Sequence, residues 1–218
     1  MSRLRFVRRI SFTAFSLSCA SALTLASLPA QAMFELKLGY AVLNSNPSAL
    51  NSAVGSGPSI GSQQAIVVDA LVMPPKFPLG LGVRYESFTQ NPGDGSTVAG
   101  GAKSTLTRVS VIINKRLVDT GFYFGPIATI GVSNALTYAL TKSNVTANDT
   151  ASGSVTASAG LEAGAKVSLI RLGGEVGYLY APLGNLKSSS GADVQNNGSS
   201  IAVDYSGAYA RATLGFGF

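Results

Sequence analysis

Apolar and polar residues alternate with a period of two along much of the chain after residue 32. In residues 33–43 every second side chain is large and apolar, and the residues between are small or charged: Phe34, Leu36, Leu38, Tyr40 and Val42 alternate with Glu35, Lys37, Gly39 and Ala41. Residues 155–169 repeat the pattern. Because successive side chains of a β-strand point to opposite faces, both segments are predicted to be amphipathic strands.

Less regular alternation marks six further segments, so the sequence predicts eight strands: 33–43, 63–73, 79–89, 104–115, 121–133, 155–169, 173–182 and 201–218. The connections alternate between long ones at 44–62, 90–103, 134–154 and 183–200 and short ones at 74–78, 116–120 and 170–172. An up-and-down sheet then has its long loops at one end and its short turns at the other. Pro126 lies inside the fifth segment and has no N–H for a strand ladder, which leaves the register of that strand open.

The length of the strands and the character of their apolar faces favour a barrel in a membrane over a soluble sandwich. The strands reach about 10 residues or more, enough to cross a bilayer at a tilt, whereas soluble strands average about 5 or 6. In this register we expect no charge on the apolar faces, which hold Leu79, Leu81, Val83 and Tyr85, then Val109, Val111 and Ile113, and finally Ala210, Ala212, Leu214, Phe216 and Phe218. The predicted fold is all-β: an up-and-down antiparallel transmembrane β-barrel of eight strands.

The polar faces of the same strands are predicted to line the lumen of the barrel. They carry five acidic and five basic side chains: Glu35, Lys37, Asp69, Arg84, Glu86, Arg108, Glu162, Lys166, Glu175 and Arg211. Glycines such as Gly82 and Gly164 lie between them. The narrow interior of a small barrel favours such residues, because they have no side chain to accommodate. We expect the charges to pair in a network that plugs the lumen, because an unpaired charge there is costly.

Residues 1–32 have the layout of a signal peptide. Basic residues come first, an apolar stretch follows at about 10–28, and a small-x-small site precedes the first strand: Arg3, Arg5, Arg8 and Arg9 at the start and Pro29-Ala30-Gln31-Ala32 at the end. We therefore expect residues 1–32 to be removed and residues 33–218 to form the barrel. Cys19 is expected to leave with the leader, since the residues before it match a lipoprotein signal poorly.

Removing the leader changes the charge and the chemistry of the chain. Of 16 Lys and Arg, four lie in the leader, so 12 face 10 Asp and Glu, a net charge of +2. Nucleic-acid binding, which needs a concentrated basic stripe, is therefore not expected. The chain has no histidine, and after Cys19 no cysteine, so we expect neither an enzyme nor a cofactor or metal. Glu35 and Glu175 could act as acid and base, but the balanced charges favour a structural pairing.

Several segments resemble those of the small eight-stranded outer-membrane barrels, the family of the OmpA membrane domain and the OmpX and OmpW types. These are Gly121-Phe122-Tyr123-Phe124-Gly125-Pro126, Gly173-Gly174-Glu175-Val176-Gly177-Tyr178 and the final segment from Ala210 to Phe218. The resemblance implies export to the bacterial outer membrane, with lipid and lipopolysaccharide as surroundings. In this family the barrel-assembly machinery recognises a last strand with alternating aromatics, a signal that Phe216 and Phe218 match.

Two functions follow from these expectations. The first is a non-enzymatic barrel with a charge-plugged lumen, which serves envelope integrity or surface interaction through four polar external loops. The alternative is a narrow pore for small solutes, as the resemblance to OmpW-type proteins implies. An eight-stranded interior is just wide enough to be filled by its own side chains, so the balanced charges favour the plug. The loop sequences identify no surface ligand.

Overall fold

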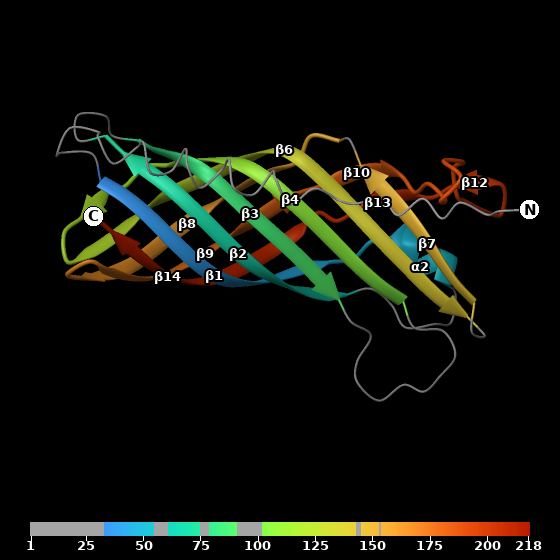
Figure 1. Cartoon of the computed structure of the whole chain (residues 1–218), viewed down its shortest axis with the longest axis horizontal. Helices are drawn as coiled ribbons and strands as arrows, with labels where there is room; N and C mark the ends of the chain where they lie inside the picture. The colour runs from blue at the N-terminus through green and yellow to red at the C-terminus, as the bar shows by residue number, and fades with distance from the viewer. Residues whose placement is uncertain (1–32, 55–60, 75–78, 91–101, 143–144, 153) are drawn as a thin grey trace, which may run out of the picture. The chain divides into compact units, whose positions relative to one another are not determined.

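The computed structural model describes residues 33–54, 61–74, 79–90, 102–142, 145–152 and 154–218. Each of eight antiparallel strands pairs with the next along the chain, and the last pairs with the first, so the sheet closes into a barrel (Figure 1). The strands are β1 (Met33–Ser45), β2 (Ser62–Met73), β3 (Gly80–Gln90), β4 (Ala102–Asn114), β6 (Phe122–Lys142), β8 (Ala157–Val167), β9 (Ile170–Tyr180) and β14 (Gly207–Gly217). The predicted fold class and strand number are confirmed. The predicted leader, with Cys19 and the cleavage site, lies outside the described residues.

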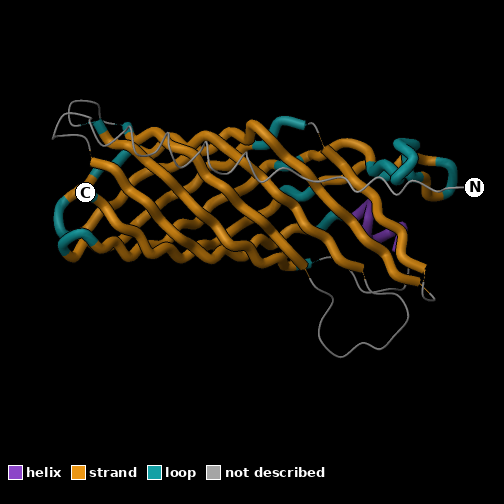
Figure 2. The backbone as a smooth tube through the Cα atoms, viewed as in Figure 1, coloured by secondary structure: helices purple, strands orange, loops and turns teal. Residues whose placement is uncertain are grey.

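The strands run obliquely around the barrel (Figure 2). The short connections lie at one end, here called the turn end, and the long ones at the other, the outer end. The seam between β1 and β14 is closed as far as the turn end, where Phe34 and Phe218 exchange two backbone hydrogen bonds of 2.8 and 3.0 Å. Their rings stack with centroids 5.8 Å apart. A closed ladder leaves no edge strand, which is a requirement for a sheet in lipid.

Strand β6 is much longer than predicted. It continues past residue 133 to Lys142, and its second half pairs with β4 on one side and with β7 (Val145–Ser152) on the other. The predicted loop at 134–154 was therefore wrong: most of it is a hairpin that extends the barrel wall. Pro126 lies opposite Leu161 of β8, and its carbonyl oxygen accepts a hydrogen bond from the Lys115 N–H. Lys115 lies just beyond the last residue of β4, so the N–H that proline lacks costs the strand ladder little at this position.

Two further predicted boundaries were wrong. The turn expected at 170–172 is formed by Ser168 and Leu169, with Ser168 at a φ of 57°, and Val167 pairs with Ile170 directly. The last strand was predicted from residue 201, but β14 begins at Gly207. The residues before it form β13 (Ala202–Asp204), which pairs with β10 (Pro182–Asn185) at the outer end.

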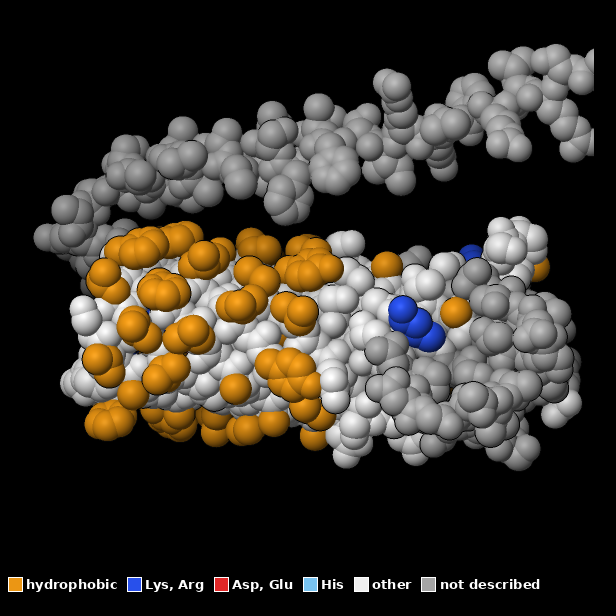
Figure 3. Space-filling view, turned by 60° about the horizontal axis from the view of Figure 1, so that its bottom comes forward, with side chains coloured by type: hydrophobic (Ala, Val, Ile, Leu, Met, Phe, Trp, Pro, Cys, Tyr) orange, Lys and Arg blue, Asp and Glu red, His pale blue; other side chains and the backbone are white. Residues whose placement is uncertain are grey.

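The outside of the barrel carries an apolar band. Outward side chains such as Leu38, Val83 and Leu161 expose 60%, 53% and 48% of their surface, and Figure 3 shows this band covering one part of the barrel wall. The expectation of a charge-free face fails near both ends of β4: Lys103 and Lys115 are exposed on the same face as Ile113, and Lys115 lies at the turn end. A lysine at that edge can extend its ammonium out of an apolar layer. Within the described residues, no helix is long and apolar enough to span a membrane.

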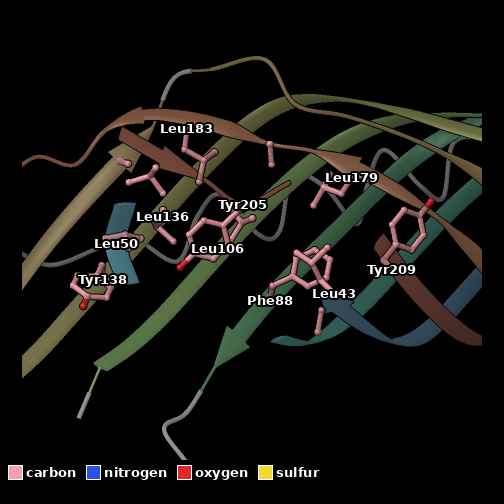
Figure 4. Close-up of a cluster of buried hydrophobic side chains, with 14 of the residues drawn as sticks. Leu43, Leu50, Phe88, Leu106, Leu136, Tyr138, Leu179, Leu183, Tyr205 and Tyr209 are labelled. Carbon is pink, nitrogen blue, oxygen red and sulfur yellow. The ribbon is translucent and has the colours of Figure 1, made fainter. Parts of the chain in front are cut away.

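The interior of the outer end is apolar, which the sequence analysis did not anticipate. Two of the predicted external loops fold over the mouth of the barrel: one contains the helix α2 (Ser48–Val54), and the other contains the β10–β13 pair. A smaller pair of strands, β11 (Gln195–Asn196) and β12 (Ser199–Ser200), forms between β10 and β13 in the sequence. Leu50 of α2 and Leu183 of β10 are buried with inward residues of the barrel strands (Figure 4). We call this cluster the outer core; it includes Leu43, Leu50, Phe88, Leu106, Leu136, Leu179, Leu183, Val203 and Tyr205.

Inward glycines make room for two tyrosine rings between the strands. Gly160 of β8 and Gly177 of β9 are directly paired, and a Cβ on Gly177 would lie 2.7 Å from the Tyr209 hydroxyl and 2.8 Å from the Cα of Gly160. Gly164 and Gly173, the second inward pair of the same two strands, flank Tyr123. These positions must lack a side chain because a tyrosine and a neighbouring backbone already occupy the space.

This packing predicts that Gly177→Ala lowers the free energy of unfolding by about 1–3 kcal/mol, because the added methyl meets both a ring and a backbone. Urea unfolding of the refolded protein in lipid vesicles measures the loss. Gly174→Ala is the matched control. Gly174 points outward from the same strand, and a Cβ there would lie 3.5 Å from the Arg211 carbonyl oxygen, an ordinary contact. We expect it to change stability by less than about 0.5 kcal/mol. Equal effects of the two substitutions would contradict the packing described.

Candidate functional site

The charged interior is the candidate site. Nine of the ten predicted lumen charges point inward and expose 6% or less of their surface: Glu35, Lys37, Asp69, Arg84, Glu86, Arg108, Glu162, Glu175 and Arg211. The tenth, Lys166, lies at the turn end, where it exposes 16% of its side chain and pairs with Asp119. The buried charges form two layers along the barrel axis, described below as the middle layer and the turn-end layer.

Arg84 is the centre of the middle layer. Its guanidinium donates to both carboxylate oxygens of Asp69, at 2.7 and 2.8 Å, and to both of Glu175, at 3.0 and 2.8 Å. Asp69 lies on the neighbouring strand β2, but Glu175 lies on β9, four strands away from β3 in a ring of eight. The Arg84–Glu175 pair therefore joins opposite walls of the barrel, with both side chains about 2% exposed or less.

Two further arginines complete the middle layer. Arg211 donates to Glu175 at 2.7 Å and also pairs with Glu86 of β3. Arg108 donates to Glu86 at 2.5 Å, and its other nitrogens donate to the hydroxyls of Thr156 and Thr129 at 2.7 and 2.6 Å. The Tyr209 hydroxyl donates to Glu175 at 2.6 Å. The six charged members of the middle layer, three acidic and three basic, balance: Asp69, Arg84, Glu86, Arg108, Glu175 and Arg211.

The turn-end layer is built around Glu35. Arg116 donates to this carboxylate at 2.6 Å, the Arg171 Nε lies 2.6 Å from it, and the Lys37 ammonium lies 3.6 Å from it. Lys37 also pairs with Glu162 on the far side of the lumen, and Asn114 donates to Glu162 as well. The charged residues of this layer are Glu35, Lys37, Arg116, Glu162 and Arg171.

Arg116 and Arg171 were missed by the sequence analysis, which placed both in turns. Strand alternation could have identified them: Arg171 is an even number of residues from Glu175, and Arg116 is two residues after the inward Asn114. The Arg116 guanidinium also lies 4.6 Å from the centroid of the Tyr123 ring, within the range of a cation–π contact. Both arginines supply positive charge to the turn-end layer.

The two ionic layers and the outer core thus place buried side chains at three levels of the described interior. At the outer end, burial raises the pKa of the Tyr205 phenol to about 12, so this group stays neutral within the outer core. In the part of the chain that the structure describes, no group of three Asp, Glu, His or Cys side chains is placed to hold a metal ion. What the arrangement does chemically is pair charges across the lumen, so that each buried carboxylate described above has a cationic partner.

Phe216 and Phe218, predicted as an assembly signal, lie on the outward face of β14 and the residue after it. They expose 49% and 66% of their surface. The two side chains are thus part of the apolar band at the turn end rather than of the charged interior.

No protein-family model and no curated protein matches the chain. Among solved structures, it is similar to Ail, the attachment invasion locus protein of Yersinia pestis, with a TM-score of 0.59 at 10% sequence identity over 86% of this chain and 99% of that one. It is also similar to a major outer membrane protein from Thermus thermophilus, with a TM-score of 0.54 at 14% identity over 86% and 99% of the two chains. At such identities the likeness concerns the fold. With its closed ring of eight strands, apolar outside and charged inside, the chain has the fold of the small eight-stranded outer-membrane β-barrels.

Proposed function

We propose that this protein is a non-enzymatic barrel of the bacterial outer membrane whose lumen is closed, and that it serves envelope integrity or surface interaction. The observation that carries the proposal is the Arg84–Glu175 pair, which crosses the full width of the barrel in the middle layer. A solute on the barrel axis would have to break the hydrogen bonds from Arg84 to the four carboxylate oxygens of Asp69 and Glu175. Breaking a buried pair costs several kcal/mol.

Two further levels support closure. On the turn-end side of the middle layer, Lys37 and Glu162 join β1 to β8 across the lumen. On its outer side, Leu50 of α2 and the inward side chains of the outer core occupy the mouth of the barrel. A solute would therefore meet three obstacles in series, two ionic and one apolar, each built from residues of several strands.

The geometry of the carboxylates favours a structural over a catalytic role. Glu35 and Glu175, the pair that could act as acid and base, belong to different layers, and each is held by at least two cationic side chains. Carboxylates held by several cationic side chains in this way are typical of structural ion-pair networks. A non-enzymatic role also fits a chain without histidine.

The outer-membrane location is supported by the apolar band and by the fold. Leucines, valines and isoleucines with half or more of their surface exposed are costly in water and suited to lipid. Insertion by the barrel-assembly machinery, with Phe216 and Phe218 as the signal, is part of the same proposal. The outer end, with the β6–β7 hairpin, then forms the surface presented to the outside.

We predict that the protein, refolded into planar bilayers, gives no steady channel current at neutral pH, because the two ionic layers and the outer core close the lumen. Insertion is checked on the same preparation by heat-modifiable migration in detergent gels, which a closed barrel shows until its strand ladder melts. A steady current from inserted wild-type protein would contradict the closed barrel and support the narrow pore instead.

We further predict that Arg84→Met lowers the free energy of unfolding by about 3–5 kcal/mol and introduces channel openings, because Asp69 and Glu175 lose their shared cation within the lumen. Adding Asp69→Asn should restore part of the stability by removing the unpaired charge. Lys187→Met, at an exposed lysine of the outer end, is the control and should change stability by less than about 0.5 kcal/mol. Similar values for Arg84→Met and Lys187→Met would show that the middle layer does not hold the barrel together.

A further inference from the structure

The barrel wall is irregular at one level on both sides of β6. On one side β6 pairs with β8 as far as Ile130, opposite Ala157, and with β7 from Ala135, opposite Ser152. These pairs keep the register of one continuous hairpin, yet the strand ladder between them is interrupted. On the other side the pairing with β4 shifts by one residue at Val132, which is the extra residue of a bulge. We call this level the crease; it comprises residues 131–134 of β6 and the described residues 154–156 that face them.

The crease separates the part of the hairpin that lies in the apolar band from the part beyond it. Val132 and Val155 are outward at the crease and expose 65% and 70% of their surface. Beyond it the outward Thr137 is polar, while Leu136 and Tyr138 point inward and belong to the outer core. Figure 1 shows β7 beside the outer part of β6, away from the turn end. A bulge bends the strand that carries it, and the interrupted ladder on the β8 side removes a restraint on that bend.

Side-chain hydrogen bonds take the place of the missing ladder. The Thr156 hydroxyl donates to the side-chain oxygen of Asn134 at 2.7 Å, and the Asn134 side-chain nitrogen donates to the carbonyl of Ser154 at 2.9 Å. The Gly131 N–H donates to the carbonyl of Thr156 at 2.7 Å. A Cβ on Gly131 would overlap the Thr156 hydroxyl, so the glycine leaves room for these bonds. The two sides of the crease are therefore held by a few specific contacts.

Arg108 connects the crease to the middle layer. Its Nε donates to the Thr156 hydroxyl oxygen at 2.7 Å, while its Nη1 donates to Glu86 at 2.5 Å. Arg108 and Thr156 are both buried. A buried donor that loses its acceptor costs free energy, so the positions of Thr156 and of the Arg108 guanidinium depend on each other. We call this chain of hydrogen bonds the pin; it consists of Glu86, Arg108, Thr156 and Asn134.

The free side of the hairpin is held by two backbone hydrogen bonds. Thr150 of β7 and Lys187, in the connection after β10, exchange N–H···O bonds of 2.8 Å each. Among the residues that the structure describes, no other backbone hydrogen bond joins β7 to this connection. We call the Thr150–Lys187 bridge the latch. Ala151 and Leu186, the neighbours of these two residues, are buried in the outer core, so the closed latch keeps that side of the outer core covered.

We propose that the crease is a hinge for the β6–β7 hairpin, and that the pin couples the position of the hairpin to the charges that close the lumen. The hairpin bends together with the outer part of β4, to which it stays paired, and β7 parts from Lys187 at the latch. Coupling between two sites is reciprocal. A ligand that holds the hairpin would therefore act on Arg108, and a change in the middle layer would act on the latch. The inference rests on the proposed location only in taking the hairpin to lie outside the membrane.

The test follows hydrogen exchange at the two latch amides, those of Thr150 and Lys187, by NMR on the full chain inserted in lipid discs. Thr156→Val removes the hydroxyl of the pin and nearly keeps the shape of the side chain. Its latch amides should exchange about tenfold faster than those of wild type, as the loss of one or two buried hydrogen bonds would produce. Amides of β1, such as that of Leu38, should keep their rates. Unchanged latch exchange in this variant would overturn the hinge.

Thr129→Val is the matched control. The Thr129 hydroxyl accepts from the same Arg108 guanidinium at 2.6 Å and is also buried, but Thr129 pairs with Ser158 inside the regular ladder. Its loss should leave latch exchange as in wild type. Thr156→Ser retains the hydroxyl and should also keep wild-type rates. Equal acceleration by Thr129→Val and Thr156→Val would show a general loosening of the barrel and would contradict a hinge at the crease.

Arg108→Met tests the link to the middle layer. It should accelerate latch exchange at least as much as Thr156→Val, and the double variant should exchange no faster than Arg108→Met alone, because both changes break the same chain. Effects that multiply, or no effect of Arg108→Met, would show that the middle layer does not hold the hairpin. Should Thr156→Val fail to insert, Asn134→Leu breaks the pin at its other end with the same expected result. A wild-type chain that does not insert contradicts the proposed location, whereas latch exchange in an inserted chain tests this inference alone.

Discussion

The structure depends on one constraint: charges placed inside a closed barrel must find partners inside it. Arg84 meets this constraint by holding Asp69 of the neighbouring strand and Glu175 of the opposite wall at once. A shift of one residue in the register of β3 would turn Arg84 and Glu86 toward lipid and leave their partners unpaired. Such a shift would cost several kcal/mol at each charge, so the ionic layers fix the register of the strands as well as closing the lumen.

The remaining interior follows from how these layers are accommodated. Tyrosine side chains that extend into the lumen need neighbouring positions without side chains, and the glycine pairs of β8 and β9 provide them. Toward the outer end the inward residues become apolar, and the barrel strands alone do not cover them. Leu50 of α2 and Leu183 of β10 complete that cluster, so two of the external connections are part of the core as well as part of the surface.

Much of this could be predicted from strand alternation, because a period of two decides which residues share a face. That rule identified the inward side of β1, β3 and β9 and the outward aromatics of β14. It did not identify where strands end: β6 continues to Lys142 past an irregularity in its pairing with β4, after which the inward residues are even-numbered, such as Leu136, instead of odd-numbered, such as Ile127. The tight turn at Ser168 and Leu169 likewise moved Arg171 from a connection into a strand. Partners such as Arg84 and Glu175 could not be predicted either, since the height of a residue in the barrel depends on the stagger of all eight strands.

The central claim is that ion pairs across the lumen hold opposite walls together, and a double-mutant cycle on Arg84 and Glu175 tests it most directly. Unfolding free energies of wild type, Arg84→Met, Glu175→Gln and the double variant, measured in lipid vesicles, give the coupling between the two side chains. The structure predicts a coupling of about 1–3 kcal/mol, as expected for partners in one buried network. Additive effects, with a coupling within about 0.3 kcal/mol of zero, would contradict the claim that this pair ties β3 to β9.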